Sequence, residues 1–122
     1  MKVIHTNTAP AAIGPYSQAI VAGDLIFCSG QTPLSLDGQI TGSTITEQTE
    51  QVIKNLKAVL EEAGSSLEKA VKTTCFLADM GDFAAFNGVY EKHFTGKPAR
   101  STVAAKGLPR NVLVEIEVIA EL

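Results

Sequence analysis

The stretch of residues 44–77, TITEQTEQVIKNLKAVLEEAGSSLEKAVKTTCFL, decides the fold class, because it places a long amphipathic helix directly before a buried strand. Thr44 and Glu47 have the spacing of a capping box, which predicts that a helix begins after Thr44. Residues 71–77 mix β-branched, aromatic and cysteine side chains, which is typical of a buried strand. Between them, apolar side chains recur at helical spacing until Gly64, namely Val52, Leu56, Val59, Leu60 and Ala63.

The chain before this stretch is rich in β signals. Residues 17–21 and 25–29 are apolar strand candidates, and the Ala22-Gly23-Asp24 segment between them is a hairpin signal. Residues 36–39 contain Asp-Gly, which tolerates the positive φ of a tight turn. We therefore expect a β-rich N-terminal third.

The chain after this stretch predicts a second helix and two more strands. Asp82 can cap a helix that ends near Gly96. Residues 100–105 and 112–120 read as strands, and the short loop between them predicts an antiparallel hairpin. The helix carries an aromatic stripe that is more typical of a core than of a binding site, consisting of Phe83, Phe86, Tyr90 and Phe94.

This order of elements predicts an α+β fold in which one mixed sheet carries both helices on a single face. Two helices leave the other sheet face uncovered. The last strand nevertheless has apolar residues on both faces, since Leu113 and Ile119 alternate with Val114, Ile116 and Val118. We therefore expect a partner subunit to cover the second face, and the pattern does not choose between a dimer and a trimer.

Composition excludes several classes of protein. With 122 residues, 45% of them hydrophobic and 19% charged, the chain is expected to form a single globular domain over residues 1–122. A net charge of -3 with scattered lysines and arginines does not favour nucleic-acid binding. No segment approaches the roughly 18 apolar residues of a membrane span, and no leader pattern begins the chain, so we expect a cytoplasmic protein without a membrane partner.

The soft side chains do not predict a metal site or a disulfide. Cys28 and Cys75 lie far apart inside apolar runs, which favours buried, reduced thiols over a redox pair. Their spacing from His5 and His93 does not resemble a zinc site. We therefore expect no bound metal.

Charged residues interrupt the last predicted hairpin. If Ala105 pairs with Val112, then Thr102 faces Glu115 and Arg100 faces Glu117, which would gather one cation, one hydroxyl and two carboxylates. A cross-strand salt bridge that only sets the register explains this pattern as well as a functional site does.

Other polar residues lie at the ends of elements. Tyr16 follows Gly14-Pro15, Ser29 and Gly30 end a strand, and Asn87 lies within the aromatic helix. Taken singly, these residues are typical of a turn, a strand terminus and a solvated helix position. Phosphate-binding loops and nucleophile motifs are absent from the sequence, so nucleotide-dependent and nucleophilic chemistry are not favoured.

Together these residues resemble the RidA/YjgF family of reactive-intermediate imine deaminases. The similarity runs nearly from end to end. Its most specific part lies in residues 98–117, where PARS, LP and VEIE follow one another. The preceding segments are AAIGPYSQA at 11–19, SGQ at 29–31, VKTT at 71–74, and Asp82, Phe83 and Asn87.

The resemblance implies a chorismate-mutase-like fold and a homotrimer with active sites between subunits. It also implies hydrolysis of 2-imino acids such as 2-iminobutanoate and 2-iminopropanoate, formed from the enamines that pyridoxal-phosphate dehydratases release, to 2-oxo acids and ammonia without a cofactor. Arg100 would bind the substrate carboxylate and Glu115 would position the attacking water. Thr102 stands where some relatives have Cys, which excludes a thiolate at that position. The resemblance assigns substrate contacts to Tyr16, Ser29, Gly30, Phe83, Asn87 and Thr102.

Two other functions stay open on the sequence. The chain could be a non-catalytic module, chaperone-like or binding small carboxylates through Arg100. An endoribonuclease or translation inhibitor is disfavoured by the acidic composition and by the absence of a catalytic histidine pair. The preferred imino acid cannot be predicted, because it depends on loop conformation.

Overall fold

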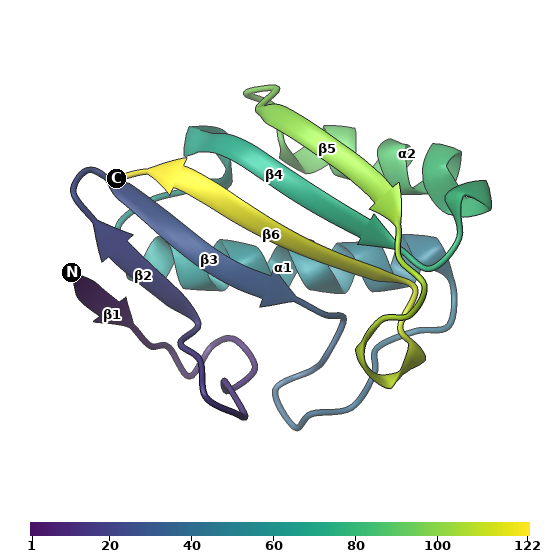
Figure 1. Ribbon diagram of the computed structural model, residues 1–122, viewed down its shortest axis with the longest axis horizontal. Coiled ribbons are helices and arrows are strands. Elements are labelled where there is room, and N and C mark those ends of the chain that lie inside the picture. Colours follow the sequence, from purple (N-terminus) through teal and green to yellow (C-terminus); the bar gives the residue numbers. More distant parts are fainter.

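Six strands form one mixed sheet in the computed structural model, which describes residues 1–122. The spatial order of the strands is β1-β2-β3-β6-β4-β5 (Figure 1). Neighbouring strands are antiparallel except β4 and β5, which are parallel. The strands are β1 Lys2–Ile4, β2 Ala19–Ala22, β3 Leu25–Gln31, β4 Ala70–Leu77, β5 Ala99–Ala104 and β6 Val114–Glu121.

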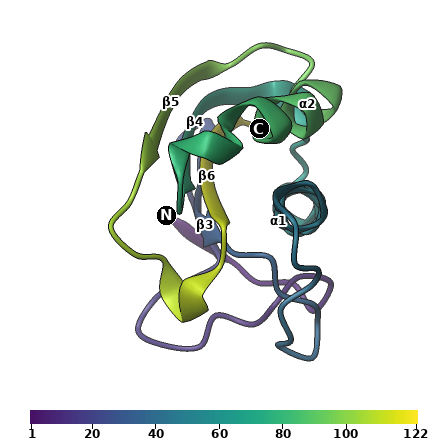
Figure 2. The same cartoon turned by 90° about the vertical axis from the view of Figure 1, so that its right-hand side faces the viewer.

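Both long helices, α1 (Ile45–Glu62) and α2 (Phe83–His93), pack on the same face of this sheet, as predicted (Figure 2). The predicted capping box is present: Glu47 N donates to Thr44 Oγ1 at 3.2 Å, and Thr44 N donates to the Glu47 carboxylate at 3.2 Å. The chain leaves the helix at Gly64, whose φ of 84° suits a residue without a side chain. Local signals therefore place α1 correctly.

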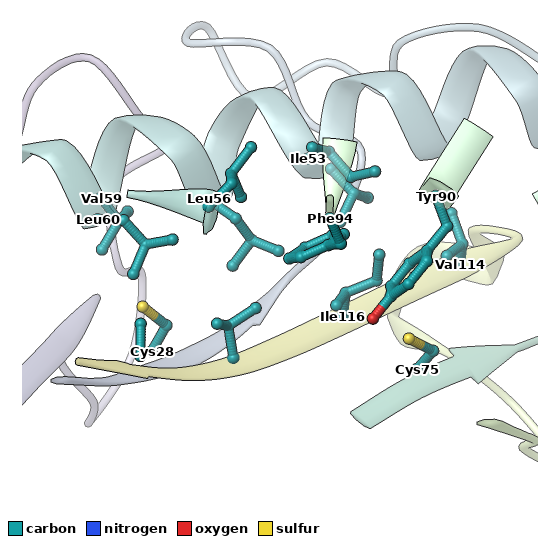
Figure 3. Close-up of a cluster of buried hydrophobic side chains, with 14 of the residues drawn as sticks. Cys28, Ile53, Leu56, Val59, Leu60, Cys75, Tyr90, Phe94, Val114 and Ile116 are labelled. Carbon is teal, nitrogen blue, oxygen red and sulfur yellow. The ribbon is translucent and has the colours of Figure 1, made fainter. Parts of the chain in front are cut away.

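The core lies between α1, α2 and the sheet and is one cluster of 22 buried residues. Leu56, Val59 and Leu60 of α1 point toward β3 and β6 (Figure 3). Cys28 and Cys75 are buried in this layer, as predicted. Burial raises the pKa of the Cys28 thiol to about 12 and that of Cys75 to about 11, so neither is a reactive thiolate at neutral pH.

The aromatic stripe of α2 is part of the core, as predicted. Phe86, Tyr90 and Phe94 are buried, and Figure 3 shows Tyr90 and Phe94 among the core side chains. The Tyr90 hydroxyl is hydrogen-bonded to Thr73 Oγ1 on β4 at 2.7 Å. Asp82 precedes the helix but makes no side-chain capping bond. Asp79 accepts from Gly81 N instead, at 2.8 Å, within a short 3₁₀ turn that leads into α2.

The prediction of a final antiparallel hairpin is wrong. β4 lies between β5 and β6, with Thr73 opposite Arg100 on one side and opposite Val118 on the other. The physical reason is that β4, α2 and β5 form a strand–helix–strand unit, and such a crossover places its two strands parallel and adjacent. The short strand β1 was not predicted, because three residues carry too little periodicity.

The sheet face opposite the helices has no covering element in this chain (Figure 2). Phe27 is 41% exposed and Val103 is 48% exposed. Phe76 and Ile119 lie between them and are only partly buried. The sheet therefore presents the uncovered apolar face expected from the sequence, while the assembly that would cover it stays a prediction. No helix is both long and apolar enough to cross a bilayer.

Candidate active site

Glu115 lies on the uncovered face of the sheet and lines a cleft of about 570 Å³. Tyr16, Ser29 and Gly30 line the same cleft, so the structure brings four of the predicted site residues together. Arg110 is a further lining residue, and the sequence did not indicate it. The cleft is therefore built from the loop before β2, the end of β3 and the start of β6.

Gly30 allows the Glu115 side chain to cross the neighbouring strand. The register between β3 and β6 shifts between Cys28 and Gln31, which marks a local bulge around Gly30. A Cβ atom at residue 30 would lie 3.0 Å from Glu115 Cδ and would collide with Oε2. A side chain at residue 30 would therefore displace the Glu115 carboxyl from its position.

The Glu115 carboxyl is half-buried. Burial, and to a lesser extent the neighbouring Glu117 carboxylate on the same face, raise the pKa of Glu115 above its usual value. A carboxylate with a raised pKa is a stronger base, as a group that takes a proton from water must be. The sequence correctly predicted that these two glutamates share a face.

Ser29 positions the loop that carries Tyr16. Its hydroxyl donates to the Ser17 carbonyl at 2.6 Å, and its backbone N–H donates to the Gln18 carbonyl at 3.0 Å. The buried Gln18 side chain holds the preceding loop, since Nε2 donates to the carbonyls of Thr6 and Pro10 and Oε1 accepts from Thr6 N. Tyr16 itself stays 54% exposed and free to contact a ligand.

Arg110 is held at the cleft by a strained turn. Pro109–Asn111 form a single 3₁₀ turn in which Arg110 has φ 56° and Asn111 has φ 57°. Left-handed backbone costs roughly 1–2 kcal/mol for each residue with a side chain, and it is concentrated at functional sites. Arg110 Nη1 donates to the Gly38 carbonyl at 2.6 Å, which joins this turn to the loop before α1.

Arg100 lies on β5, and its side chain points to the helix-covered face, where it contacts residues of α2. Its Nη1 donates to Asn87 Oδ1 at 2.7 Å. Its guanidinium carbon lies 4.7 Å from the ring centre of Tyr90, 5.5 Å from that of Phe83 and 5.9 Å from that of Phe86. The structure therefore brings Asn87 and Phe83 to Arg100. The hydrogen bond to Asn87 and the cation–π contacts with the rings orient the guanidinium. Asn87 is not the solvated helix position that its sequence context favoured.

No carboxylate of the chain neutralises Arg100, because both ion pairs of the chain are made by Glu50 with Lys92 and His93. Thr102 shares the face of Arg100, as predicted, and lies opposite Cys75 on β4. Its hydroxyl is buried without a hydrogen-bond partner. Tyr90, not singled out from the sequence as a site residue, contributes the nearest ring.

Arg100 and Glu115 do not converge within one chain, so the predicted four-residue cluster is wrong. Arg100 shares a face with its register partner Thr73, whereas Glu115 shares the opposite face with Phe76. The insertion of β4 causes this separation, because residues 100 and 115 would need adjacent strands to meet. Within one chain, Arg100 and Glu115 therefore lie on opposite faces of the sheet.

Another cleft, of about 590 Å³, follows the outer side of α1. It contains none of the predicted site residues. His93 Nε2 lies 2.9 Å from a Glu50 carboxylate oxygen within it, and this contact ties α2 to α1. The chemistry that the sequence predicts is therefore not located there.

Comparison with known proteins agrees with the motifs. Residues 6–122 match the family model described as Endoribonuclease L-PSP. The chain is 54% identical over 124 residues to a Lactococcus lactis protein named as a regulator, AldR, covering 100% of this chain and 98% of that protein. Among solved structures it is similar to YyfA of Yersinia pestis, of the conserved Rid protein family, with 47% identity, a TM-score of 0.96, and coverage of 99% and 98% of the two chains.

A second solved structure, that of E. coli TdcF with bound serine, is 38% identical with a TM-score of 0.94, and the match covers 100% of this chain and 99% of that one. The fold agrees in each case over nearly the whole chain. On this family match and these similarities, the chain belongs to the RidA/YjgF family.

Proposed function

We propose that this protein hydrolyses small 2-imino acids to 2-oxo acids and ammonia, at sites shared between neighbouring copies of the chain. The observation that carries the proposal is that the Arg100 side chain is held in one orientation but has no ion-pair partner in its own chain. Asn87 and three aromatic rings orient its guanidinium, and no carboxylate of its own chain pairs with it. A planar guanidinium that is already oriented and unpaired is suited to bind a carboxylate through two parallel hydrogen bonds.

The geometry within one chain supports a shared site. Arg100 and Glu115 lie on opposite sheet faces, and the face around Glu115 exposes apolar side chains such as Phe27 and Val103. A second copy that covered this face could bring its Arg100 to the rim of the Glu115 cleft. The family resemblance favours a homotrimer, and we propose that assembly.

In the proposed reaction, water adds to the C=N carbon and the C–N bond then breaks. Arg100 holds the substrate carboxylate, which places the imine carbon beside a water molecule hydrogen-bonded to Glu115. The Glu115 carboxylate takes a proton from the water as its oxygen bonds to carbon, and passes it to the imine nitrogen, which gives a carbinolamine. The remaining hydroxyl proton then passes through the same carboxylate to nitrogen as the C=O bond forms, the C–N bond breaks and ammonia leaves. The step balances with water as the only co-reactant.

The raised pKa of Glu115 suits this role, because a more basic carboxylate removes a proton from water more readily. Positioned acid–base groups typically contribute factors of roughly 10² to 10⁴ to a rate. The backbone of Gly30 beside Glu115 leaves room for polar contacts to the substrate nitrogen or oxygen. Tyr16 offers a hydroxyl at the cleft mouth.

The similar protein TdcF, whose structure contains bound serine, supports a small amino-acid-like ligand. Serine carries a carboxylate next to the carbon that bears nitrogen, as a 2-imino acid does. We therefore propose 2-iminobutanoate and 2-iminopropanoate as substrates. Such imines arise from the enamines that dehydratases of hydroxy amino acids release.

The test generates imine in place with an amino-acid oxidase and follows its decay with and without this protein. We expect the wild type to accelerate decay, and Arg100→Ala and Glu115→Gln to abolish the acceleration. Arg100→Lys should fail nearly as badly as Arg100→Ala, because an ammonium cannot reproduce the two parallel hydrogen bonds. Glu121→Gln is the matched control, since it removes one exposed carboxylate from the same strand away from the cleft. Decay that the wild type does not accelerate refutes the proposal.

A second candidate is a module that binds small carboxylates without converting them. It is favoured by the same unpaired Arg100 and by the similar AldR protein, which is named as a regulator. Tight binding of 2-oxobutanoate without faster imine decay would select this module. The family description names an endoribonuclease, but the two histidines do not pair: His5 contacts Asn7, and His93 contacts Glu50.

A further inference from the structure

The cleft around Glu115 contains a cation that the proposed hydrolysis does not use. A 2-imino acid with one carboxylate needs only Arg100. Arg110 lies in the same cleft as Glu115, yet the two form no ion pair, because the ion pairs of the chain are confined to Glu50. The guanidinium of Arg110 makes a single hydrogen bond, to the Gly38 carbonyl, and most of its N–H donors stay available.

The structure holds this guanidinium in place from two directions. The left-handed backbone of Arg110 and Asn111 sets where the side chain leaves the turn. The turn is closed by Asn111 N donating to the Leu108 carbonyl at 3.0 Å. The hydrogen bond to the Gly38 carbonyl, which lies outside the cleft lining, then anchors the far end of the side chain to the loop before α1. Such a cation is oriented before any ligand arrives, which reduces the entropy lost on binding.

The walls of the cleft suit a short hydrocarbon chain. Ile13, Leu34 and Val112 supply apolar surface between the polar groups. A volume of about 570 Å³ is also larger than the smallest imino acids require. A substrate with a methylene chain between two acidic groups would therefore match the cleft from end to end.

We propose that Arg110 binds a second acidic group of the substrate, so that this protein accepts the imines of dicarboxylic amino acids. The inference rests on the proposed function for the placement of the first carboxylate at Arg100. The second carboxylate then lies against Arg110 and the methylene groups lie along the apolar walls. Arg110 is a specificity residue that takes no part in proton transfer.

The test measures ligand binding without turnover. Calorimetry compares 2-oxoglutarate with 2-oxobutanoate, which are the stable 2-oxo acid products expected from a dicarboxylic and a monocarboxylic imino acid. We expect the wild type to bind 2-oxoglutarate more tightly. A charge-assisted hydrogen bond is worth enough to change affinity by roughly tenfold to a hundredfold, so Arg110→Gln should lower the ratio of the two affinities by about that factor.

Lys106→Gln is the matched control, because it removes one exposed positive charge from the same loop without lining the cleft. We expect it to leave the ratio unchanged. Equal losses for both ligands in Arg110→Gln overturn the inference, since this is what a purely structural tether to Gly38 predicts. Wild-type protein that does not prefer 2-oxoglutarate also overturns it. Because binding is read without turnover, failure of the hydrolysis proposal would show in the imine assay alone.

Discussion

Two inactive variants should restore each other if each site takes Arg100 from one copy and Glu115 from another. Arg100→Ala keeps the carboxylate half of every site and Glu115→Gln keeps the guanidinium half. In an assembly made from one chain type, every site lacks one group. In a mixed assembly, the sites between an intact Arg100 and an intact Glu115 regain both.

The size of the recovery follows from the geometry. At equal amounts and random assembly, half of the sites have an intact Arg100 and half of those face an intact Glu115, so about one quarter of the sites are complete in a ring of any size. Loss of a general base typically reduces a rate by roughly 10² or more, so each variant alone should retain at most about one hundredth of the wild-type rate. The mixture should thus exceed either parent by at least about 25-fold.

The measurement is imine decay after the two variants are unfolded together and refolded, with one variant carrying an affinity tag. The rate is measured on the whole refolded mixture, since the expected one quarter refers to all sites. Retention of the untagged variant with the tagged one shows that mixed assemblies have formed, and light scattering gives their size. Each variant refolded alone is the control. Mixed assemblies that stay at the parental rate would refute a site shared between copies, whatever the role of either residue.

Three further outcomes follow from the side-chain environments. Burial first, and then the Glu117 charge, raise the pKa of Glu115. The rate should therefore fall as the pH drops through that raised pKa, because the base becomes protonated. Glu117→Gln should move this acid limb of the pH–rate profile to lower pH, and an unmoved limb contradicts the assignment of Glu115 as the base. Gly30→Ala should displace the Glu115 side chain and lower the rate by about tenfold or more while the urea midpoint changes little, and full activity would show that the close packing is unimportant. Tyr90→Phe should leave the buried Thr73 hydroxyl with only the weak Cys75 thiol as a partner and lower the free energy of unfolding by about 1–3 kcal/mol, which a urea titration would reveal as an earlier midpoint.

The sequence predicted the elements whose signals are local. The start of α1 depends on Thr44 and Glu47, three residues apart, and the structure shows the reciprocal hydrogen bonds that this spacing implies. The two faces of β6 also follow from strict alternation, which put Glu115 and Glu117 on the same side. These features depend on neighbours along the chain, so a single sequence suffices for them.

The candidate site was predicted only in part, because its assembly depends on non-local pairing. Nothing near residue 100 in the sequence indicates that β4 rather than β6 lies beside β5, except the helix between β4 and β5. The left-handed backbone at Arg110 could not be predicted from the sequence either, since arginine has no preference for that conformation. Tyr90 was correctly assigned to the core, but its contact with Arg100 depends on how α2 lies across β5.

The separation of Arg100 from Glu115 within one chain has a functional consequence. In the hairpin that the charge pattern suggested, cross-strand side chains would lie only about 5 Å apart at their Cβ atoms, so the guanidinium and a carboxylate would pair directly. Removing one partner from a buried pair costs roughly 3–5 kcal/mol, and a substrate would have to replace that partner. With β4 inserted, no carboxylate of the same chain reaches Arg100. In the proposed shared site, the distance between Arg100 and Glu115 would be set by how two copies pack, and that packing would have to leave room for an imine and a water molecule between them.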